Sequence, residues 1–172
     1  MTQLYVDATV LISLGQIGEL RHLTAFETPI IVLPTVQSEV TTQPAAANLE
    51  RFCDHGRVTT TPPVTPADDQ SMGILGESAV NGDVRLIGAV LAHTAADESV
   101  AIVSDDRCVR TVADGLGGQV TGTIGVCLRA VEAGYPQAEA RDLIRQLDAN
   151  GLHMTAQLRS KAIDLIDEAG TQ

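Results

Sequence analysis

The chain has 172 residues, 44% of them hydrophobic, which is enough to bury the core of one domain. Only 2% of the residues are aromatic and Trp is absent, so any nucleic-acid contact must use the backbone or a narrow pocket rather than a broad stacking surface. The net charge of −11 is spread along the whole chain, which excludes a basic tail for non-specific nucleic-acid binding.

Neither a signal-peptide pattern nor an apolar stretch of about 18 residues is present, so we expect a cytoplasmic protein without a membrane span. The three cysteines are odd in number and lack a CxxC spacing, so we expect buried, reduced thiols at Cys53, Cys108 and Cys127. The histidines have no spacing typical of a metal site, and we expect structural or surface positions for His22, His55, His93 and His153.

Short apolar runs alternate with helical patterns through the first half of the chain. These runs predict strands at 4–6 and 30–33, and a weaker one at 57–60. Helical spacing of apolar residues predicts helices at 8–14, 17–26, from 34 onwards, 45–52 and about 70–75. Residues 61–69 form a loop, and residues 76–82 are ambiguous.

The second half continues the alternation. A long helix begins at Asp83, followed by a buried strand at 100–103 and a helix with Cys108, Val109, Val112 and Ala113 on one side. A last strand at 119–121 precedes helices at about 123–133, 136–149 and 155–169. Strands that alternate with helices predict an α/β fold with a parallel sheet covered on both faces.

We expect one domain over 1–172, with a core at 1–134 and a carboxy-terminal helical pair at 135–172. Each helix of the pair has an apolar stripe, one with Leu143 and Leu147, the other with Leu158, Ala162 and Leu165. These stripes could pack on the core or form a dimer, and we favour the core.

Acidic residues follow the predicted strands. Asp7 ends the first strand, Asp105 and Asp106 end the strand at 100–103, Glu39 lies in the helix after the second strand, and Asp83 begins the long helix. Because the carboxyl ends of parallel strands meet at one edge, these carboxylates should converge there and repel one another. Mg²⁺ or Mn²⁺ would relieve that repulsion, and such ions support phosphodiester hydrolysis by activating water.

Simpler explanations exist for several of these residues. Asp7, Asp105 or Asp106 could merely cap the helix that follows it. Arg107 and Arg110 could position a substrate phosphate, but Arg110 could equally form an intrahelical ion pair with Asp106. A phosphatase-type enzyme with Asp7 as nucleophile ranks low, because Thr9 stands where a second Asp is expected.

Four stretches carry a family resemblance: 5–12 (YVDATVLI), 31–39 (IVLPTVQSE), 104–110 (SDDRCVR) and 120–126 (VTGTIGV). Together the sequence resembles the PIN-domain family of metal-dependent ribonucleases, in particular those of the toxin-nuclease type, from about residue 2 to residue 169. The resemblance implies a three-layer α/β/α sandwich with a mainly parallel sheet and additional carboxy-terminal helices. It assigns Asp7, Glu39 and one or both of Asp105 and Asp106 to the metal cluster.

The resemblance also implies that Thr9 and Ser104 support the carboxylates. The relatives begin the long helix with Gly-Glu, whereas this chain offers both Gly76-Glu77 and Gly82-Asp83. We prefer Asp83, because the apolar residues Leu86, Ile87, Val90 and Leu91 follow it in helical phase.

The resulting hypothesis is a Mg²⁺- or Mn²⁺-dependent endoribonuclease. Its catalytic and metal-binding residues are Asp7, Glu39, Asp83, Asp105 and Asp106, and its substrate-contacting residues are Thr9, Ser104, Arg107 and Arg110. The resemblance also implies the toxin of a toxin–antitoxin pair, with RNA as substrate, a small antitoxin as partner and a homodimer as working unit. The alternative is an inactive PIN-like binding or scaffold protein, favoured by the net charge of −11 and by the unsettled position at 77 or 83.

Overall fold

Five short strands form a single parallel sheet at the centre of the molecule. In the computed structural model, which describes residues 1–170, they are β1 (Gln3–Val6), β2 (Ile30–Ile31), β3 (Val58–Thr59), β4 (Val100–Val103) and β5 (Gln119–Thr121). Their order is β3-β2-β1-β4-β5, with Leu4 of β1 paired to Ile30 on one side and to Ala101 on the other. The parallel α/β architecture is therefore confirmed.

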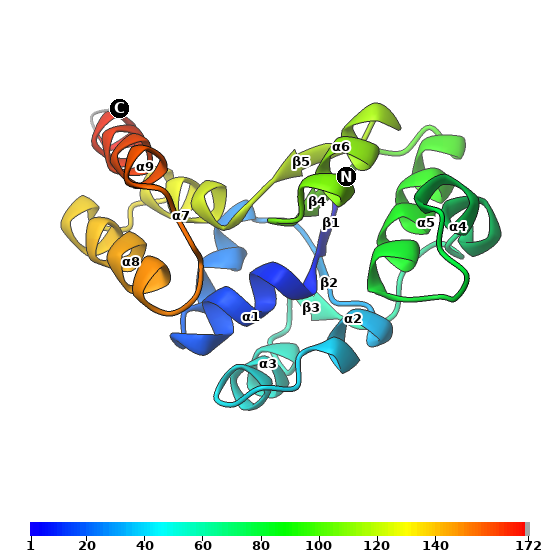
Figure 1. Cartoon of the computed structure of the whole chain (residues 1–172), viewed down its shortest axis with the longest axis horizontal. Helices are drawn as coiled ribbons and strands as arrows, with labels where there is room; N and C mark the ends of the chain where they lie inside the picture. The colour runs from blue at the N-terminus through cyan, green and yellow to red at the C-terminus, as the bar shows by residue number, and fades with distance from the viewer. Residues whose placement is uncertain (171–172) are drawn as a thin grey trace.

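The helices cover both faces of this sheet. They are α1 (Ala8–Gln16), the 3₁₀ helix η1 (Leu20–Phe26), α2 (Pro34–Glu39), α3 (Ala45–Cys53), α4 (Asp68–Leu75), α5 (Gly82–Ala95), α6 (Arg107–Gly115), α7 (Thr123–Glu132), α8 (Gln137–Ala149) and α9 (Ala156–Ala169). In Figure 1, α4 and α5 lie on one side of the sheet, and α7 to α9 on the other. None of the helices within residues 1–170 is both long and apolar enough to cross a membrane.

The core lies between the sheet and these helices. Tyr5 and Ile102 of the central strands are fully buried, as are Leu86, Ile87 and Val90 of α5. The buried hydroxyl of Tyr5 is hydrogen-bonded to His93 Nε2 at 2.8 Å, which ties β1 to the far turns of α5. Burial also raises the pKa of Tyr5. His93 therefore has a structural position, and it orients α5, the helix that carries Asp83 in its first turn.

The carboxy-terminal helices pack on α7, as the core-packing alternative predicts. Leu143 and Leu147 of α8 are buried there. The expected stripe on α9 is confirmed only at Ala162, because Leu158 is 44% exposed and Leu165 is half-buried, while Ile166 is the second buried residue. The side of α9 that packs on α7 and α8 is thus set by Ala162 and Ile166, and Leu158 falls outside it.

Two further expectations are corrected. The predicted helix at 17–26 forms only the 3₁₀ turns of η1, since Gly18 adopts a left-handed conformation with φ of 72° and interrupts the pattern. The cysteines are not uniformly buried: Cys127 is buried, Cys53 is half-buried and Cys108 is exposed. On α6 the buried residues are Val109 and Ala113, so Cys108 lies just beyond the edge of the apolar face.

Candidate functional site

The order of the strands reverses between β1 and β4, and we use the word crevice for the region beyond the carboxyl ends of these two strands. The chain moves from β1 outward through β2 and β3, then returns to place β4 on the other side of β1. In parallel sheets, ligands bind at such a reversal, beyond the carboxyl ends of the strands. Asp7 follows β1 and Ser104 follows β4, and the Asp7 backbone N–H donates to the Val103 carbonyl at 2.9 Å. The sheet therefore brings together two segments 97 residues apart.

Asp7 is the most enclosed carboxylate of the crevice, with 2% of its surface exposed. Its Oδ2 accepts hydrogen bonds from Ser104 Oγ at 2.6 Å and from Thr9 Oγ1 at 2.8 Å. Ser104 is fully buried, so its hydroxyl serves to hold the Asp7 carboxylate. The same two hydroxyls accept from the backbone N–H groups of Asp106 at 3.0 Å and Asp105 at 3.1 Å. The network fixes Asp7 and the turn after β4 as one unit.

The charges of Asp7 and Asp106 in this unit act on the carboxyl group of Asp83. Asn81 caps α5 by accepting from the Val84 backbone N–H at 2.9 Å, which places Asp83 in the first turn of the helix. Burial is the main cause that raises the pKa of Asp83 to about 6, and the charges of Asp7, Asp106 and Glu39 contribute to this value in that order. No basic side chain is among the groups that act on it. The crevice is therefore a concentration of negative charge.

Glu39 reaches the same place from the end of α2. Its Oε1 accepts a hydrogen bond from the Gly82 backbone N–H at 2.7 Å. A Cβ atom at Gly82 would lie 2.7 Å from both carboxylate oxygens of Glu39, so this close approach requires a glycine. The pair Gly82-Asp83 thus brings Glu39 and α5 together at the start of the long helix.

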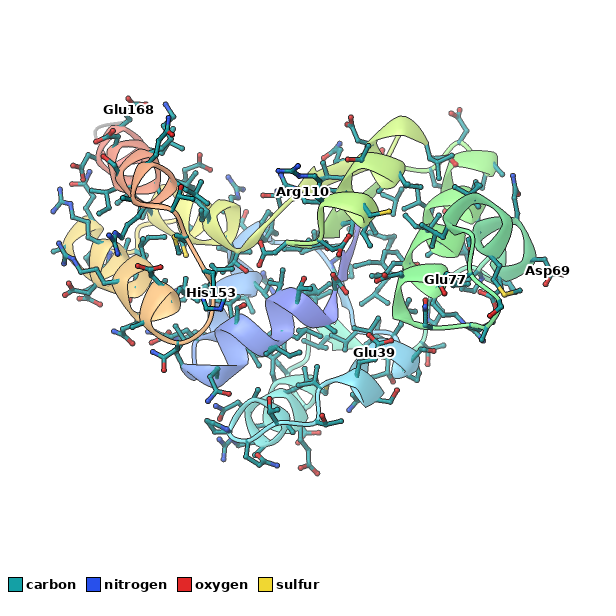
Figure 2. The ribbon with its side chains drawn as sticks, viewed as in Figure 1. Glu39, Asp69, Glu77, Arg110, His153 and Glu168 are labelled. Carbon is teal, nitrogen blue, oxygen red and sulfur yellow. The ribbon has the colours of Figure 1, made fainter. Side chains whose placement is uncertain are left out.

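Glu77 occupies a different position. It is exposed in the loop after α4, and its charge is the weakest of the contributions to the raised pKa of Asp83. Gly76, which precedes it, ends α4 in a left-handed conformation with φ of 72°. Figure 2 shows Glu39 and Glu77 on the side of the molecule that carries α4 and α5. Among the carboxylates, Asp7 acts most strongly on Asp83 and Glu77 most weakly, which favours Asp83 over Glu77 as the neighbour of Asp7.

We expect Gly82→Ala to displace the Glu39 carboxylate while leaving the fold intact. The new methyl group would meet only the end of a flexible side chain, so the backbone need not move. If Glu39 is a ligand, Mn²⁺ binding measured by calorimetry should weaken about 10- to 100-fold, the range for disturbing the surroundings of a metal site. Gly73→Ala, on the open side of α4, is the matched control. Equal Mn²⁺ affinities for the two variants would contradict a role for the contact between Glu39 and Gly82.

The adjacent residues Asp105 and Asp106 have different surroundings. Asp106 Oδ1 caps α6 by accepting from the Val109 backbone N–H at 2.9 Å, as the capping interpretation predicts, and its charge still acts on Asp83. Asp105 is bound at both oxygens by Thr123, through the backbone N–H at 2.8 Å and Oγ1 at 2.6 Å. Asp105 is not among the charges that raise the pKa of Asp83. Asp105 therefore holds the start of α7, and Asp106 belongs with the acidic crevice.

The contact of Thr123 with Asp105 is a feature of the site that the sequence does not predict. The Gly122-Thr123 turn indicates a helix start, with backbone N–H groups that would suit a phosphate, whereas the contact with Asp105 spans 18 residues. The Thr123 side chain caps no helix, so the local sequence patterns that identify capping residues do not single it out. The sequence signal that was available is its position just after the strand at 119–121, which belongs to the same sheet as the strand before Asp105.

Arg107 and Arg110 lie just beyond the two aspartates, on the exposed side of α6. Among residues 1–170 neither forms an ion pair, so the intrahelical pair between Arg110 and Asp106 is absent. Six other arginines are paired with carboxylates: Arg21, Arg85, Arg129, Arg141, Arg145 and Arg159. Both arginines line a cavity of about 480 Å³ together with Asp105 and Asp114. Their charge is available to an anion beside the crevice.

Carboxylates at this density form the oxygen donor set that Mg²⁺ and Mn²⁺ prefer. As the side chains lie, no group of three or more His, Cys, Asp or Glu within residues 1–170 surrounds a single point that could hold a metal ion. Glu39 and Asp106 are instead hydrogen-bonded to backbone N–H groups. The donor chemistry of the crevice fits a hard cation, which would compete with these N–H groups for the same oxygens.

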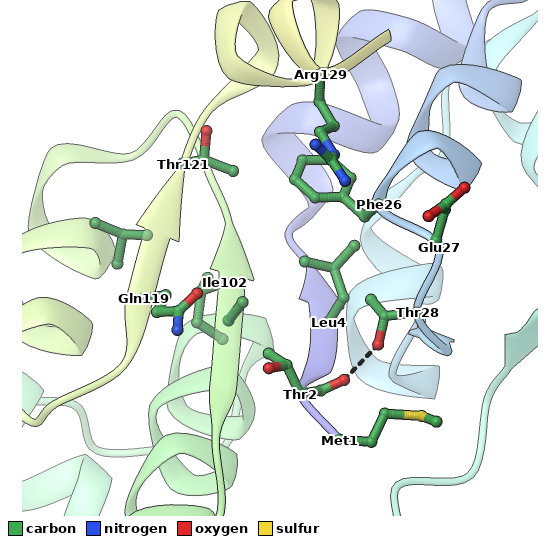
Figure 3. A pocket seen from close by; sticks show the side chains of 12 residues that line it. Met1, Thr2, Leu4, Phe26, Glu27, Thr28, Ile102, Gln119, Thr121 and Arg129 are labelled. Carbon is green, nitrogen blue, oxygen red and sulfur yellow. Dashed lines mark hydrogen bonds between the residues drawn. The ribbon is translucent and has the colours of Figure 1, made fainter. Parts of the chain in front are cut away.

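Another cavity, of about 470 Å³, lies away from the acidic residues (Figure 3). It is bordered by Leu4 near the start of β1, Phe26 at the end of η1, and Arg129 of α7. The Thr28 hydroxyl donates to the Thr2 carbonyl at its edge. Its single carboxylate is Glu27, so it lacks the concentration of charge that marks the crevice between β1 and β4.

A family model described as a PIN domain matches residues 4–168, which is nearly the whole chain. The matched range includes every acidic residue of the crevice and the carboxy-terminal helices α8 and α9 up to residue 168. No curated protein and no solved structure matches the chain.

Proposed function

Because the chain belongs to the PIN-domain family, we propose that it is a Mg²⁺- or Mn²⁺-dependent endoribonuclease. Asp7, Glu39, Asp83 and Asp106 would hold the cation. The observation that supports this proposal is the gathering of these carboxylates at the reversal point of the sheet, with no basic side chain among the groups that act on Asp83. A cation at this place would relieve their repulsion.

When bound, such an ion activates a water molecule and neutralises charge that builds up on a phosphate. The chain's own residues supply orientation. Ser104 and Thr9 hold the Asp7 carboxylate in one direction, and Asp105 fixes the start of α7 next to it. Arg107 and Arg110, which form no ion pair within residues 1–170, would contact phosphate groups on the α6 side.

RNA as the substrate follows from the family resemblance of the sequence, and so do a small antitoxin as partner and a homodimer as working unit. We propose them on that basis. The negative charge of the surface argues that phosphates are bound at a few positions such as Arg107 and Arg110, because a general electrostatic attraction is missing.

The first test is cleavage of an end-labelled single-stranded RNA by the purified protein. We expect internal cleavage with millimolar Mn²⁺ or Mg²⁺ and none with EDTA. A DNA of the same sequence tests the preference for RNA. Absence of metal-dependent cleavage over a panel of RNA sequences would contradict the enzyme.

The second candidate is a PIN-like protein that binds without cleaving. The hydrogen bonds that already occupy Glu39 and Asp106, together with the net charge of −11, favour it. The two candidates differ in one outcome. A binding protein would be stabilised by Mn²⁺ or by a protein partner and would leave every RNA intact.

A further inference from the structure

A groove lies next to the acidic crevice, on the far side of Asp105. It runs between the start of α7, at Gly122 and Ile124, and the segment 150–155 that joins α8 to α9. The groove has a volume of about 380 Å³, and its walls combine the apolar side chains of Ile124 and Met154 with the ring of His153. It is therefore an apolar site with a few polar groups.

This groove is continuous with the phosphate side of the crevice. Asp105 and Arg110 line both the groove and the cavity that contains Arg107. Figure 2 shows Arg110 on α6 and His153 on the segment before α9, on the side of the molecule that carries α7. An RNA strand whose phosphates contact Arg107 and Arg110 would thus place its next nucleotide at the groove.

The segment that carries His153 is held to α8 by hydrogen bonds on both sides of this residue. The Leu152 backbone N–H donates to the Leu147 carbonyl at 3.0 Å, and the Met154 backbone N–H donates to Asp148 Oδ1 at 3.3 Å. Asp148 in turn forms an ion pair with Arg159 of α9. The segment therefore joins α8 and α9 in a defined conformation.

His153 itself is left free by this arrangement. Its side chain is exposed, and within residues 1–170 it makes neither an ion pair nor a side-chain hydrogen bond. It is also the one ring among the residues that line the groove. A chain with 2% aromatic residues has few other planar groups to offer a base, and a narrow pocket is where such a ring is effective.

We propose that this groove is a nucleotide subsite, in which the base next to the cleaved phosphate stacks on His153 while Arg110 contacts its phosphate. The inference rests on the proposed nuclease function and deepens it. Met154 and Ile124 supply the apolar wall that a base requires, and the anchored segment fixes the backbone that carries the ring, which lowers the cost of ordering on binding. The carboxy-terminal helices thus have a role in substrate selection, apart from the acidic crevice.

The test compares three variants in the cleavage of labelled single-stranded RNA with Mn²⁺. His153→Ala should raise KM roughly 5- to 100-fold, the range for losing one stacked base, with a smaller change in kcat. It should also reduce the preference for the base beside the cut, read from the ends of the products. His153→Phe keeps a planar ring and should retain the parent's KM. His55→Ala removes an exposed histidine between α3 and β3 and is the matched control.

The outcomes separate the subsite from the nuclease function. Cleavage by the parent with equal KM for His153→Ala and His55→Ala would overturn the subsite and leave the nuclease standing. A parent that cleaves no RNA would overturn both. A groove that serves a protein partner would give a third result: His153→Ala would lose that partner while RNA cleavage stayed unchanged, and the subsite would be wrong.

Discussion

Asp7→Asn is expected to lower RNA cleavage in Mn²⁺ by roughly 10³-fold, because losing a central ligand removes several kcal/mol of transition-state stabilisation. Asp7 is the carboxylate that the crevice holds most firmly, through Ser104 Oγ and Thr9 Oγ1. An amide oxygen can still accept from these two hydroxyls, so the local structure should persist. Mn²⁺ binding by calorimetry should be greatly weakened in parallel.

The matched control is Asp69→Asn, which makes the same change of charge on the exposed outer side of α4 (Figure 2). This variant should bind Mn²⁺ and cleave RNA like the parent. Both variants should show cooperative thermal unfolding, which separates a lost ligand from a lost fold. If Asp7→Asn keeps its Mn²⁺ affinity, the cation is not held in the crevice and the assignment of the site is wrong.

The metal-free protein is expected to become less stable as the pH rises from about 4 to about 6, and Asp83→Asn should remove part of that loss. The pKa of Asp83 is raised from 3.8 to about 6 by burial and by Asp7, Asp106 and Glu39. Between these values the folded chain keeps a proton that the unfolded chain has released. The contribution of this group to stability is therefore complete below pH 3.8 and is lost as the pH passes 6.

Melting temperatures in EDTA at pH 4 to 7.5 measure this effect. The melting temperature of Asp83→Asn should exceed that of the parent at pH 7 and above, and the difference should shrink toward pH 4. Asp69→Asn again controls for a general change of charge. A difference between Asp83→Asn and the parent that does not vary with pH would show that Asp83 is not held among like charges.

Added Mn²⁺ should stabilise the parent protein more strongly as the pH rises. Because ligands bind metal in their ionised form, the increase in melting temperature with Mn²⁺ should be larger at pH 7.5 than at pH 5. In Asp83→Asn this increase should be smaller at both pH values.

The sequence by itself determined the architecture of this protein. Apolar runs such as 100–103 are short, rich in β-branched residues and followed at once by polar residues, which is the pattern of buried parallel strands. The acidic residues could be predicted to converge because their places follow from the strands: Asp7 comes directly after β1, Asp106 comes three residues after β4 ends, and parallel strands end at the same edge. The helical phase after Asp83 likewise favoured it over Glu77.

Only the tertiary structure decided which acidic side chains point into the crevice and which are bound elsewhere. Asp105 and Asp106 are neighbours in one turn, and no periodicity shows which points into the crevice. The choice is made by Thr123, whose N–H and hydroxyl bind both oxygens of Asp105 from the next strand's end. His153 gave no signal for the same reason: its place beside Arg110 depends on how α8 and α9 pack on α7, and hence on contacts between residues far apart in the chain. Local patterns record the direction of a backbone, whereas the direction of a side chain in a turn depends on partners that folding brings to it.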